Sequence, residues 1–406
     1  MLKKIINLSK IYSWDVNNNC INQKLNQQIL IKNNKIIKIG SDIVDKADDI
    51  IDGRNCIATP GFIDSHTHPI FKGNRANEFN MRLNGKSYEE IKNSGGGILS
   101  SIKNVRAATF DELYVSSIEN IKPFINYGTT TLEAKSGYGL TLKDEIKSLK
   151  VIKKINNNLD IEILPTFLGA HAVPNEYSAD KYVDIICNEM IPQVSEKKLA
   201  IFCDVFCEDG YFNIKQSKKI LNTAKSFGLI PRIHADEFKY FGASKLAVDV
   251  DAASADHLME INEEGIQALS SSNVIATLLP GTTFFLNKKK YANGRQLIDN
   301  NCNVAIASDF NPGTCTIRSL SNIMFLSMQN CGLTLDEAFL GVTYNAAKSL
   351  LKSDEIGLIN ENYKADIVLW DVHDLSEIPY WHDSSNIKIS KIFKGGSLVP
   401  NINLSV

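Results

Sequence analysis

The sequence predicts an α/β protein, a (β/α)8 TIM-like barrel with a small β-sandwich domain formed by both termini. Eight short, almost continuously apolar runs follow one another through the middle of the chain, as buried parallel strands do. Amphipathic stretches of helical period separate most of these runs, and both ends of the chain instead show short alternating strands. The 406 residues can hold one such barrel and a small second domain. A doubly wound open sheet is the competing architecture, which counting strands alone does not exclude.

The two ends of the chain predict a shared β domain. Asn33-Asn34 lies between two candidate strands and tolerates the positive φ angles of a tight hairpin turn. The tail regains strand character before a Gly395-Gly396 turn. We therefore expect 1–57 and 355–406 to form the small domain and 58–354 to form the barrel. The candidate terminal strands are Lys4–Ile11, Gln28–Lys32, Lys35–Gly40, Ala365–Asp371 and Ile387–Lys394.

The barrel elements are assigned from the alternation of apolar runs and amphipathic stretches. The eight candidate strands are Gly61–Asp64, Thr129–Ala134, Ile161–Phe167, Ile201–Phe206, Ile230–His234, Ala253–Asp256, Val274–Leu279 and Val304–Ser308. The candidate helices are Leu142–Asn156, Ser178–Val194, Asn213–Phe227, Ala243–Val250, Asn262–Ser270, Tyr291–Asn300, Ile317–Asn330 and Thr334–Leu351. Gly95-Gly96-Gly97 lacks a phosphate-binding pattern, so we assign it to a long loop that follows the first strand and closes over the site.

Composition excludes several classes of function. The net charge of −2 gives no argument for binding nucleic acid or an anionic membrane surface. No segment approaches 18 uninterrupted apolar residues, and the first residues lack the apolar core of a secretory signal. The eight cysteines include no CxxC pair, which favours free buried thiols over disulfides. We expect a cytoplasmic protein.

Polar side chains gather where the predicted strands end, the face at which barrel enzymes hold their chemistry. Five of the seven histidines occur there, and Asp309 follows the eighth strand. Three neutral imidazoles and one carboxylate suit a divalent ion such as zinc or iron, and an open position would activate water for hydrolysis. In such a site Glu237 could transfer protons and His257 could orient the water. The five histidines are His66, His68, His171, His234 and His257.

Four boxes at these strand ends resemble the amidohydrolase superfamily. They are PGFIDSHTH (60–68), HADE (234–237), DH (256–257) and SDFNPGT (308–314). Further boxes, in the same order along the chain, are similar to the imidazolonepropionase family: GNRANEF (73–79), KSGYGL (135–140), FLGAHAVP (167–174), DVFCE (204–208), SADHL (254–258) and LLPGTTFFL (278–286). The resemblance spans roughly residues 58–350, the whole predicted barrel.

The resemblance implies a metal-dependent cyclic amidohydrolase. A metal-activated water would open the cyclic amide C–N bond of 4-imidazolone-5-propanoate to give N-formimidoyl-L-glutamate, a step of histidine degradation. The implied partners are this small molecule and a second copy of the chain in a homodimer. The implied ligands of one zinc or iron ion are His66, His68, His234 and Asp309. The implied proton-handling residues are Asp309, Glu237 and His257, and which one is the principal base stays open.

The substrate's propionate needs a fixed cation, and a guanidinium can hold a carboxylate through two hydrogen bonds. Arg75, seven residues beyond His68, matches the family position, and without that context it would be assigned to the solvated surface. The other implied substrate-binding residues are Tyr138, His171, Glu237, Asn311, Gly313 and Thr314. For Tyr138 a place at the rim of the site, and for His171 a structural role, are the competing interpretations.

Two other classes of function stay open at this stage. A hydrolytic deaminase of a nucleobase or related heterocycle would share the HADE and DH boxes, and Arg75, Tyr138 and the 311–314 loop favour a carboxylate-bearing substrate instead. A non-enzymatic barrel would have lost ligands that are present here. A two-metal site is disfavoured because the fourth strand ends in Cys207-Glu208 without a lysine.

For Lys135, an ion pair with Glu133 or Glu208 is at least as good an interpretation as a catalytic role.

Overall fold

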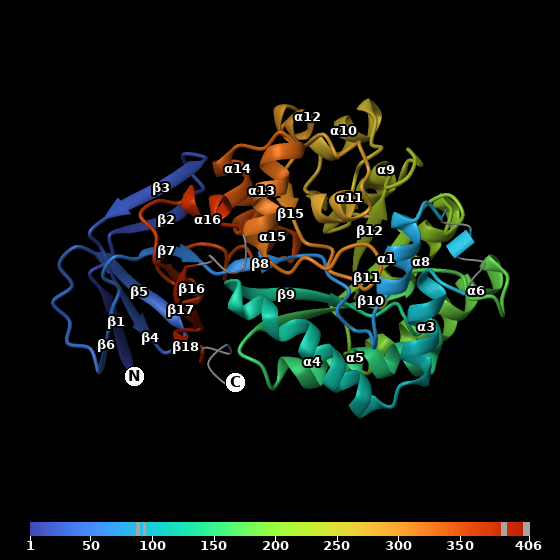
Figure 1. Ribbon diagram of the computed structural model, residues 1–406, viewed down its shortest axis with the longest axis horizontal. Coiled ribbons are helices and arrows are strands. Elements are labelled where there is room, and N and C mark those ends of the chain that lie inside the picture. The colour runs from blue at the N-terminus through green and yellow to red at the C-terminus, as the bar shows by residue number, and fades with distance from the viewer. Residues whose placement is uncertain (87–89, 92–94, 383–387, 401–406) are drawn as a thin grey trace.

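The computed structural model describes residues 1–86, 90–91, 95–382 and 388–400. An eight-stranded parallel barrel lies beside two mixed sheets built from both ends of the chain, coloured blue and red in Figure 1. The predicted α/β class and barrel architecture are therefore confirmed. The division of the chain at 57/58 and 354/355 stays a prediction. Within the described ranges, no helix combines the length and the apolar character needed to cross a membrane.

The barrel strands are buried at almost every position, because side chains fill the interior and helices cover the outside. Each strand pairs in parallel with its neighbours in chain order. The strands are β8 (Phe62–Asp64), β9 (Thr129–Lys135), β10 (Glu162–Ala170), β11 (Phe202–Cys207), β12 (Ile230–Ala235), β13 (Ser254–His257), β14 (Ile275–Leu278) and β15 (Val304–Ile306).

The barrel closes just beyond the ends of its first and last strands. His68 N donates to Phe310 O at 2.8 Å, and Asp309 N donates to His66 O at 3.0 Å. Thr67 and Phe310 also form a parallel bridge. The backbone that closes the barrel is therefore the same backbone that presents two of the predicted histidines and the predicted aspartate.

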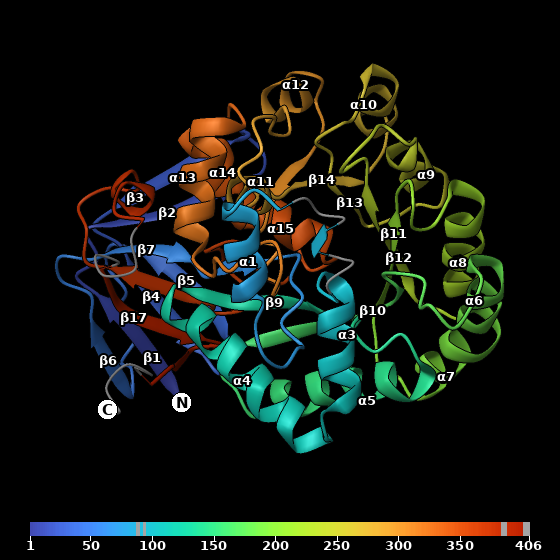
Figure 2. The same cartoon turned by 45° about the vertical axis from the view of Figure 1, so that its right-hand side comes forward.

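Helices surround the strands, as both views show (Figures 1 and 2). They are α1 (Ala76–Leu83), α3 (Ile98–Ala107), α4 (Phe110–Asn126), α5 (Leu142–Asn156), α6 (Ala179–Ile185), the π-helix η1 (Ile186–Met190), α7 (Ile191–Glu196), α8 (Ile214–Ser226), α9 (Ala243–Asp249), α10 (Glu263–Ser270), α11 (Pro280–Phe285), α12 (Gly294–Asp299), α13 (Leu320–Asn330), α14 (Leu335–Val342), α15 (Tyr344–Ser349) and α16 (Glu377–Tyr380). The predicted helix Thr334–Leu351 is wrong as one element, because the backbone turns at Thr343 (φ −123°, ψ −96°) between α14 and α15.

The long loop predicted after the first barrel strand is also wrong. This segment contains α1, α3 and the 17-residue α4. Thr109 and Glu112 form a capping box at the start of α4, a T-x-x-E pattern that is readable in the sequence. Gly97 precedes α3 with φ +74°, so the glycine run ends by starting a helix. Residues 87–89 and 92–94 of the predicted loop lie outside the described residues.

The two terminal sheets pack face to face around a shared apolar core, to which residues such as Ile31 of one sheet and Ile367 of the other contribute. The Asn33 hairpin is confirmed, with φ +56° at Asn33. The first sheet contains β1 (Leu2–Ile6), β4 (Gln28–Lys32), β5 (Lys35–Gly40) and β6 (Asp49–Asp52). The second contains β2 (Lys10–Asp15), β3 (Cys20–Leu25), β7 (Ile57–Pro60), β16 (Ile367–Trp370), β17 (Ile389–Lys394) and β18 (Ser397–Leu398).

One predicted terminal strand, Lys4–Ile11, is wrong as a single element. Asn7 takes a left-handed conformation (φ +58°), which ends β1 and lets β2 enter the other sheet. The predicted start of the last strand, Ile387, lies outside the described residues, and β17 begins at Ile389.

Candidate active site

His66 and His68 follow β8 and are both buried. Their Nε2 atoms lie 3.2 Å apart, so the alternation of an extended chain does bring the two rings to the same side, as predicted. Burial lowers the pKa of each ring well below its ordinary value, with further lowering by neighbouring positive or protonated groups. Both imidazoles are therefore neutral, the form that can bind a metal ion.

Asp309 approaches the same pair from the end of β15. Its Oδ1 lies 3.3 Å from His68 Nε2 and 3.7 Å from His66 Nε2. Its other oxygen, Oδ2, accepts a hydrogen bond of 2.5 Å from Thr282 Oγ1. One carboxylate oxygen is thus held by Thr282 and the other faces the histidines. Thr282 was not predicted from the sequence, although it lies in the LLPGTTFFL box.

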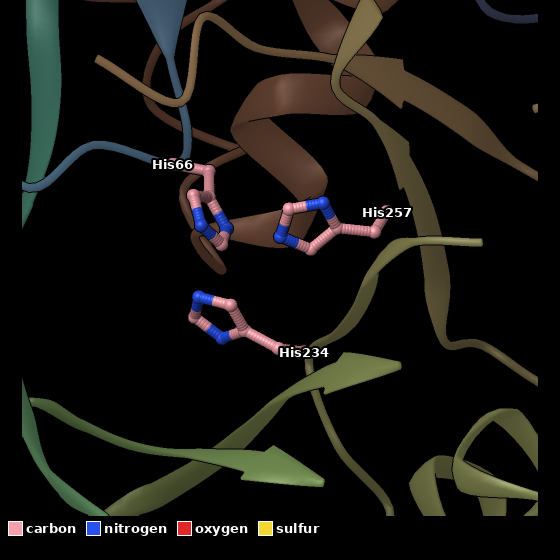
Figure 3. Close-up of side chains that lie close together, drawn as sticks. All are labelled: His66, His234 and His257. Carbon is pink, nitrogen blue, oxygen red and sulfur yellow. The ribbon is translucent and has the colours of Figure 1, made fainter. Parts of the chain in front are cut away.

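His234 and His257 complete the cluster, and their rings turn toward His66 (Figure 3). The ring centroids of His66 and His234 are 4.6 Å apart. One nitrogen each from His66, His234 and His257 lies within 4.8 Å of the others, and so do ligand atoms of His66, His68 and Asp309. Buried imidazole nitrogens with one carboxylate are the donor set of zinc and iron sites. The residues present therefore fit a metal ion.

Two aspartates that the sequence analysis did not predict orient these histidines. Asp256 Oδ2 lies 2.7 Å from His66 Nδ1, and Asp204 Oδ1 lies 3.1 Å from His234 Nδ1. Each contact places the proton on Nδ1, which leaves Nε2 free to bind a cation, as ring-orienting carboxylates do in metal sites. Burial alone would lower the pKa of His234, but the Asp204 carboxylate outweighs it and the pKa is raised.

Buried charges around the cluster also favour a divalent cation. Two cations, Lys135 and Arg232, pair with carboxylates inside the barrel. Four carboxylates are buried around these two cations and the histidines, an environment in which a divalent ion would compensate negative charge. The four are Glu133, Asp204, Asp256 and Asp309.

A cavity of about 110 Å³ opens above the cluster. All of the predicted substrate-binding residues except Gly313 line it. Its other walls include Ile98, Phe206 and Phe238, which supply apolar surface for a flat ring. The predicted lining residues are Arg75, Tyr138, His171, Glu237, Asn311 and Thr314.

Arg75 does not reach the cavity as a free cation. Its Nε and Nη2 donate to Glu78 Oε2 at 2.9 and 2.7 Å, so a carboxylate one helical turn away holds the guanidinium. The remaining Nη1 lies against Gly313, where an added Cβ would stand 2.0 Å from it. Arg82, on the same helix, donates to Gly313 O at 3.2 Å. Sequence reasoning overlooked both Glu78 and Arg82, although the former lies within GNRANEF.

The 309–314 loop is held together by the side chain of Asn311. Its Oδ1 accepts from Gly313 N and Thr314 N at 2.8 and 2.7 Å, and its Nδ2 donates to Asp309 O and Thr314 Oγ1, both at 2.7 Å. Because Thr314 Oγ1 accepts that bond, its own hydroxyl proton is directed elsewhere and can be donated to a ligand in the cavity.

Tyr138 and His171 form one wall of the cavity. His171 stacks on His68 with ring centroids 5.1 Å apart, and its Nδ1 contacts Gly137 O at 3.0 Å. Burial lowers the pKa of His171 and raises the pKa of Tyr138, so both rings are neutral. Gly137 takes φ +106°, a conformation that a side chain would strain, and this turn brings Tyr138 over the site.

Glu237 and His257 lie side by side, with Oε2 and Nε2 3.6 Å apart. Burial and the nearby Asp309 raise the pKa of Glu237 to about 8. Burial lowers the pKa of His257 to about 3. The environment therefore pushes the two groups in opposite directions: Glu237 can hold a proton near neutral pH, and His257 stays neutral and can donate a hydrogen bond.

Comparisons with known proteins found both a family model and sequence relatives for this chain. The model of the Amidohydrolase family matches residues 219–399. Imidazolonepropionase from Brevibacillus brevis is 46% identical over 352 residues, 86% of this chain and 82% of that protein. Imidazolonepropionase from Kosmotoga olearia is 45% identical over 375 residues, 92% and 91% of the two chains.

Among solved structures, guanine deaminase from C. acetobutylicum superposes with a TM-score of 0.74 over 98% of this chain and 100% of that chain. At 17% identity, this likeness shows a shared fold only. The family follows from the sequence relatives, whose identity extends over more than four-fifths of both partners. On that ground this chain belongs to the imidazolonepropionase family.

Proposed function

We propose that the protein hydrolyses 4-imidazolone-5-propanoate to N-formimidoyl-L-glutamate in histidine degradation. One observation supports this above all: a cluster of metal-binding donors and a guanidinium suited to a carboxylate open into the same cavity, which has room for a small ring. A cyclic amide with a propionate arm needs both. The reaction requires an activated water at the ring carbonyl and a proton for the leaving nitrogen.

We assign His66, His68, His234 and Asp309 as the ligands of one zinc or iron ion. When bound, such an ion acts as a Lewis acid and lowers the pKa of a water from 15.7 to about 7. Thr282 fixes Oδ2 of Asp309, so the Oδ1 atom beside the histidines is the one that would bind the ion. Asp309 is also suited to accept a proton from the attacking water, because its carboxylate lies beside the histidines that we propose as metal ligands.

Glu237 and His257 divide the remaining proton handling in this proposal. The raised pKa of Glu237 lets it carry a proton near neutral pH and donate it to the ring nitrogen as the C–N bond breaks. Neutral His257 donates a hydrogen bond that orients the water or polarises the carbonyl oxygen. Their separation of 3.6 Å lets both act on one reacting centre.

The propionate arm is assigned to the end of the cavity formed by α1 and the 311–314 loop. Glu78 occupies two N–H groups of Arg75, which leaves Nη1 as the donor nearest the loop. The Thr314 hydroxyl and the Tyr138 phenol are further donors on the lining of the same cavity. Asn311 and Gly313 act mainly by shaping this loop, and His171 packs beside the ring of the substrate.

Metal analysis combined with a substrate assay tests this function. We expect close to one zinc or iron ion per chain and hydrolysis of freshly generated imidazolone propionate, followed by loss of its absorbance. Guanine and cytosine serve as comparison substrates, because a hydrolytic deaminase is the alternative. Turnover of guanine or cytosine without turnover of the imidazolone would overturn the proposal. Zinc- and iron-reconstituted samples, assayed in parallel, identify which ion supports the higher rate.

We also propose that the protein is a cytoplasmic homodimer that binds neither nucleic acid nor membranes. The dimer is what the family resemblance implies, and the net charge of −2 supports the absence of polyanion binding. Sedimentation velocity tests the dimer: a single species at the monomer mass across the micromolar range would contradict it.

A further inference from the structure

Lys135 lies at the end of β9 and is completely buried, yet it does not line the substrate cavity. Its Nζ is 2.8 Å from Glu133 Oε1 and 2.8 Å from Asp204 Oδ2. A buried ammonium is costly unless its partners compensate for the lost solvation. Burial by itself would lower the pKa of Lys135, but Asp204 and Glu133 outweigh it and the pKa is raised, so the group is charged.

On one side, Asp204 links Lys135 to His234. Asp204 contacts Lys135 through Oδ2 and His234 Nδ1 through Oδ1, so both of its oxygens are directed by these two partners. The ammonium holds the carboxylate in the orientation that accepts the Nδ1 proton. The ring of His234 is thereby kept with Nε2 facing the cluster.

On the other side, Glu133 links Lys135 to the strand end that bears His66 and His68. Glu133 Oε2 accepts from Thr67 N at 3.0 Å, and Thr67 Oγ1 donates to the backbone carbonyl of Glu133 at 2.5 Å. Lys135 adds its own backbone N–H, which donates to Thr67 O at 3.0 Å. The residue between the two histidines is thus fixed at its N–H, its carbonyl and its hydroxyl.

We propose that Lys135 is a positioning residue of the metal centre, which ties the His66–His68 strand end to His234 through one buried ammonium. It touches no reacting atom and acts through Glu133 and Asp204. The inference rests on the proposed function only in taking the three histidines as ligands, and it holds for any substrate. Loss of this tie would loosen the donor set, an effect that orienting partners of metal ligands produce at about 10- to 100-fold in metal affinity.

Lys394 provides a matched control, because it too bridges two carboxylates. Its Nζ lies 2.7 Å from Asp366 and 3.2 Å from Glu162, and the cluster of histidines is not among its partners. Removing either ammonium takes a shared cation from two carboxylates, although Glu162 keeps its pairing with Lys364. Only the loss of the Lys135 ammonium should change the orientation of the proposed metal ligands.

The test measures metal release from the full-length holoprotein. Zinc-loaded wild type, Lys135→Met and Lys394→Met are mixed with excess chelator, and Co²⁺-substituted samples report ligand geometry through their visible absorption. We expect Lys135→Met to release metal about 10- to 100-fold faster with an altered Co²⁺ spectrum. Lys394→Met should have a lower Tm while keeping the wild-type release rate and spectrum.

Each other outcome would overturn the inference. If folded Lys135→Met shows the wild-type release rate and spectrum, the ammonium does not position the metal ligands. If Lys394→Met releases metal as fast as Lys135→Met, the faster release reflects general destabilisation of the protein. If Lys135→Met does not fold, Glu133→Gln weakens the other side of the same tie at nearly constant volume without touching a proposed ligand, and a wild-type release rate there also overturns the inference. Wild-type protein that binds no metal would instead refute the proposed function.

Discussion

The two ends of the barrel use polar and charged side chains in different ways. At the carboxyl end, His68 Nδ1 and His257 Nδ1 are buried without a hydrogen-bond partner among the described residues, and the donors around them converge on a cavity. At the amino end, Glu162 of β10 pairs with Lys364 and Lys394, which join the barrel to the terminal sheets. Polar groups at one end are thus arranged for a ligand, and at the other end for one another.

This contrast separates function from stability in a way that substitutions can test. Changes at the carboxyl end should alter metal content or substrate binding more than the free energy of unfolding, because the donor atoms there converge on the proposed metal site. Changes at the amino end should alter the free energy of unfolding and leave the site intact. A substitution that affects both properties equally would break the comparison.

Replacing His234 with alanine should have the largest effect. The change removes one proposed ligand and leaves Asp204 facing Lys135 without its histidine. We expect stoichiometric metal and hydrolysis of the imidazolone to be lost together, with the far-UV circular dichroism of the barrel unchanged. Metal analysis and the absorbance assay measure this. Full turnover by metal-free His234→Ala protein would refute the assignment of the site.

Arg75→Ala comes next, because it removes the proposed partner of the propionate but no metal ligand. Loss of one member of a buried charged pair costs about 2–4 kcal/mol, which corresponds to about 30- to 1000-fold in kcat/KM. We expect most of this in KM, with metal content unchanged. Arg295→Ala is the matched control, since Arg295 pairs with Asp299 and Glu337 on the surface. An unchanged KM in Arg75→Ala would show that the propionate binds elsewhere.

Gly313→Ala should have a smaller effect through the same subsite. A Cβ at this position would stand 2.0 Å from Arg75 Nη1, and Glu78 restrains the guanidinium from moving away. We expect KM to rise about tenfold, the equivalent of 1.4 kcal/mol, with kcat and metal content retained. Gly40→Ala, where the nearest atom to an added Cβ is 3.9 Å away, supplies the control. A KM equal to that of the control would separate Gly313 from the arginine.

How far the sequence predicted this arrangement depends on the range of the interactions involved. His66 and His68 could be placed on one side because the alternation of a strand is local, and Asp309 could be placed with them because parallel strands end together. The Asn33 hairpin and the α4 capping box are likewise local signals, although the second was overlooked.

Contacts between distant strands could not be predicted in the same way. Lys135 was expected to pair with Glu133 or Glu208; the first pairing is confirmed, while Glu208 instead accepts from Phe238 N at 2.9 Å. Its second partner, Asp204, comes from β11, and only the closed barrel brings these side chains together. The ion pair between Arg75 and Glu78 was not predicted, because the segment that contains α1 was assigned to a loop.

The smallest effect is expected at the amino end of the barrel. Burial alone would raise the pKa of Glu162, but Lys394 and Lys364 outweigh it, so the folded-state pKa is lowered. A carboxyl with a lowered pKa stabilises the fold above its unfolded pKa of about 4.3, and this stabilisation is lost as the pH falls through the folded value. Glu162→Gln should therefore cost about 1 kcal/mol at pH 7, and the difference from wild type should shrink below about pH 4.

Urea unfolding of wild type and Glu162→Gln across this pH range measures that difference, with metal content determined on the same samples. We expect the metal content and KM of Glu162→Gln to match wild type, because its partners Lys364 and Lys394 join the barrel to the terminal sheets. Glu119→Gln, at an exposed carboxyl on α4, makes the same change in net charge away from these ion pairs and serves as the control. A gap in stability that widened toward acid would contradict the lowered pKa. Loss of metal from Glu162→Gln would show that the two ends of the barrel are coupled.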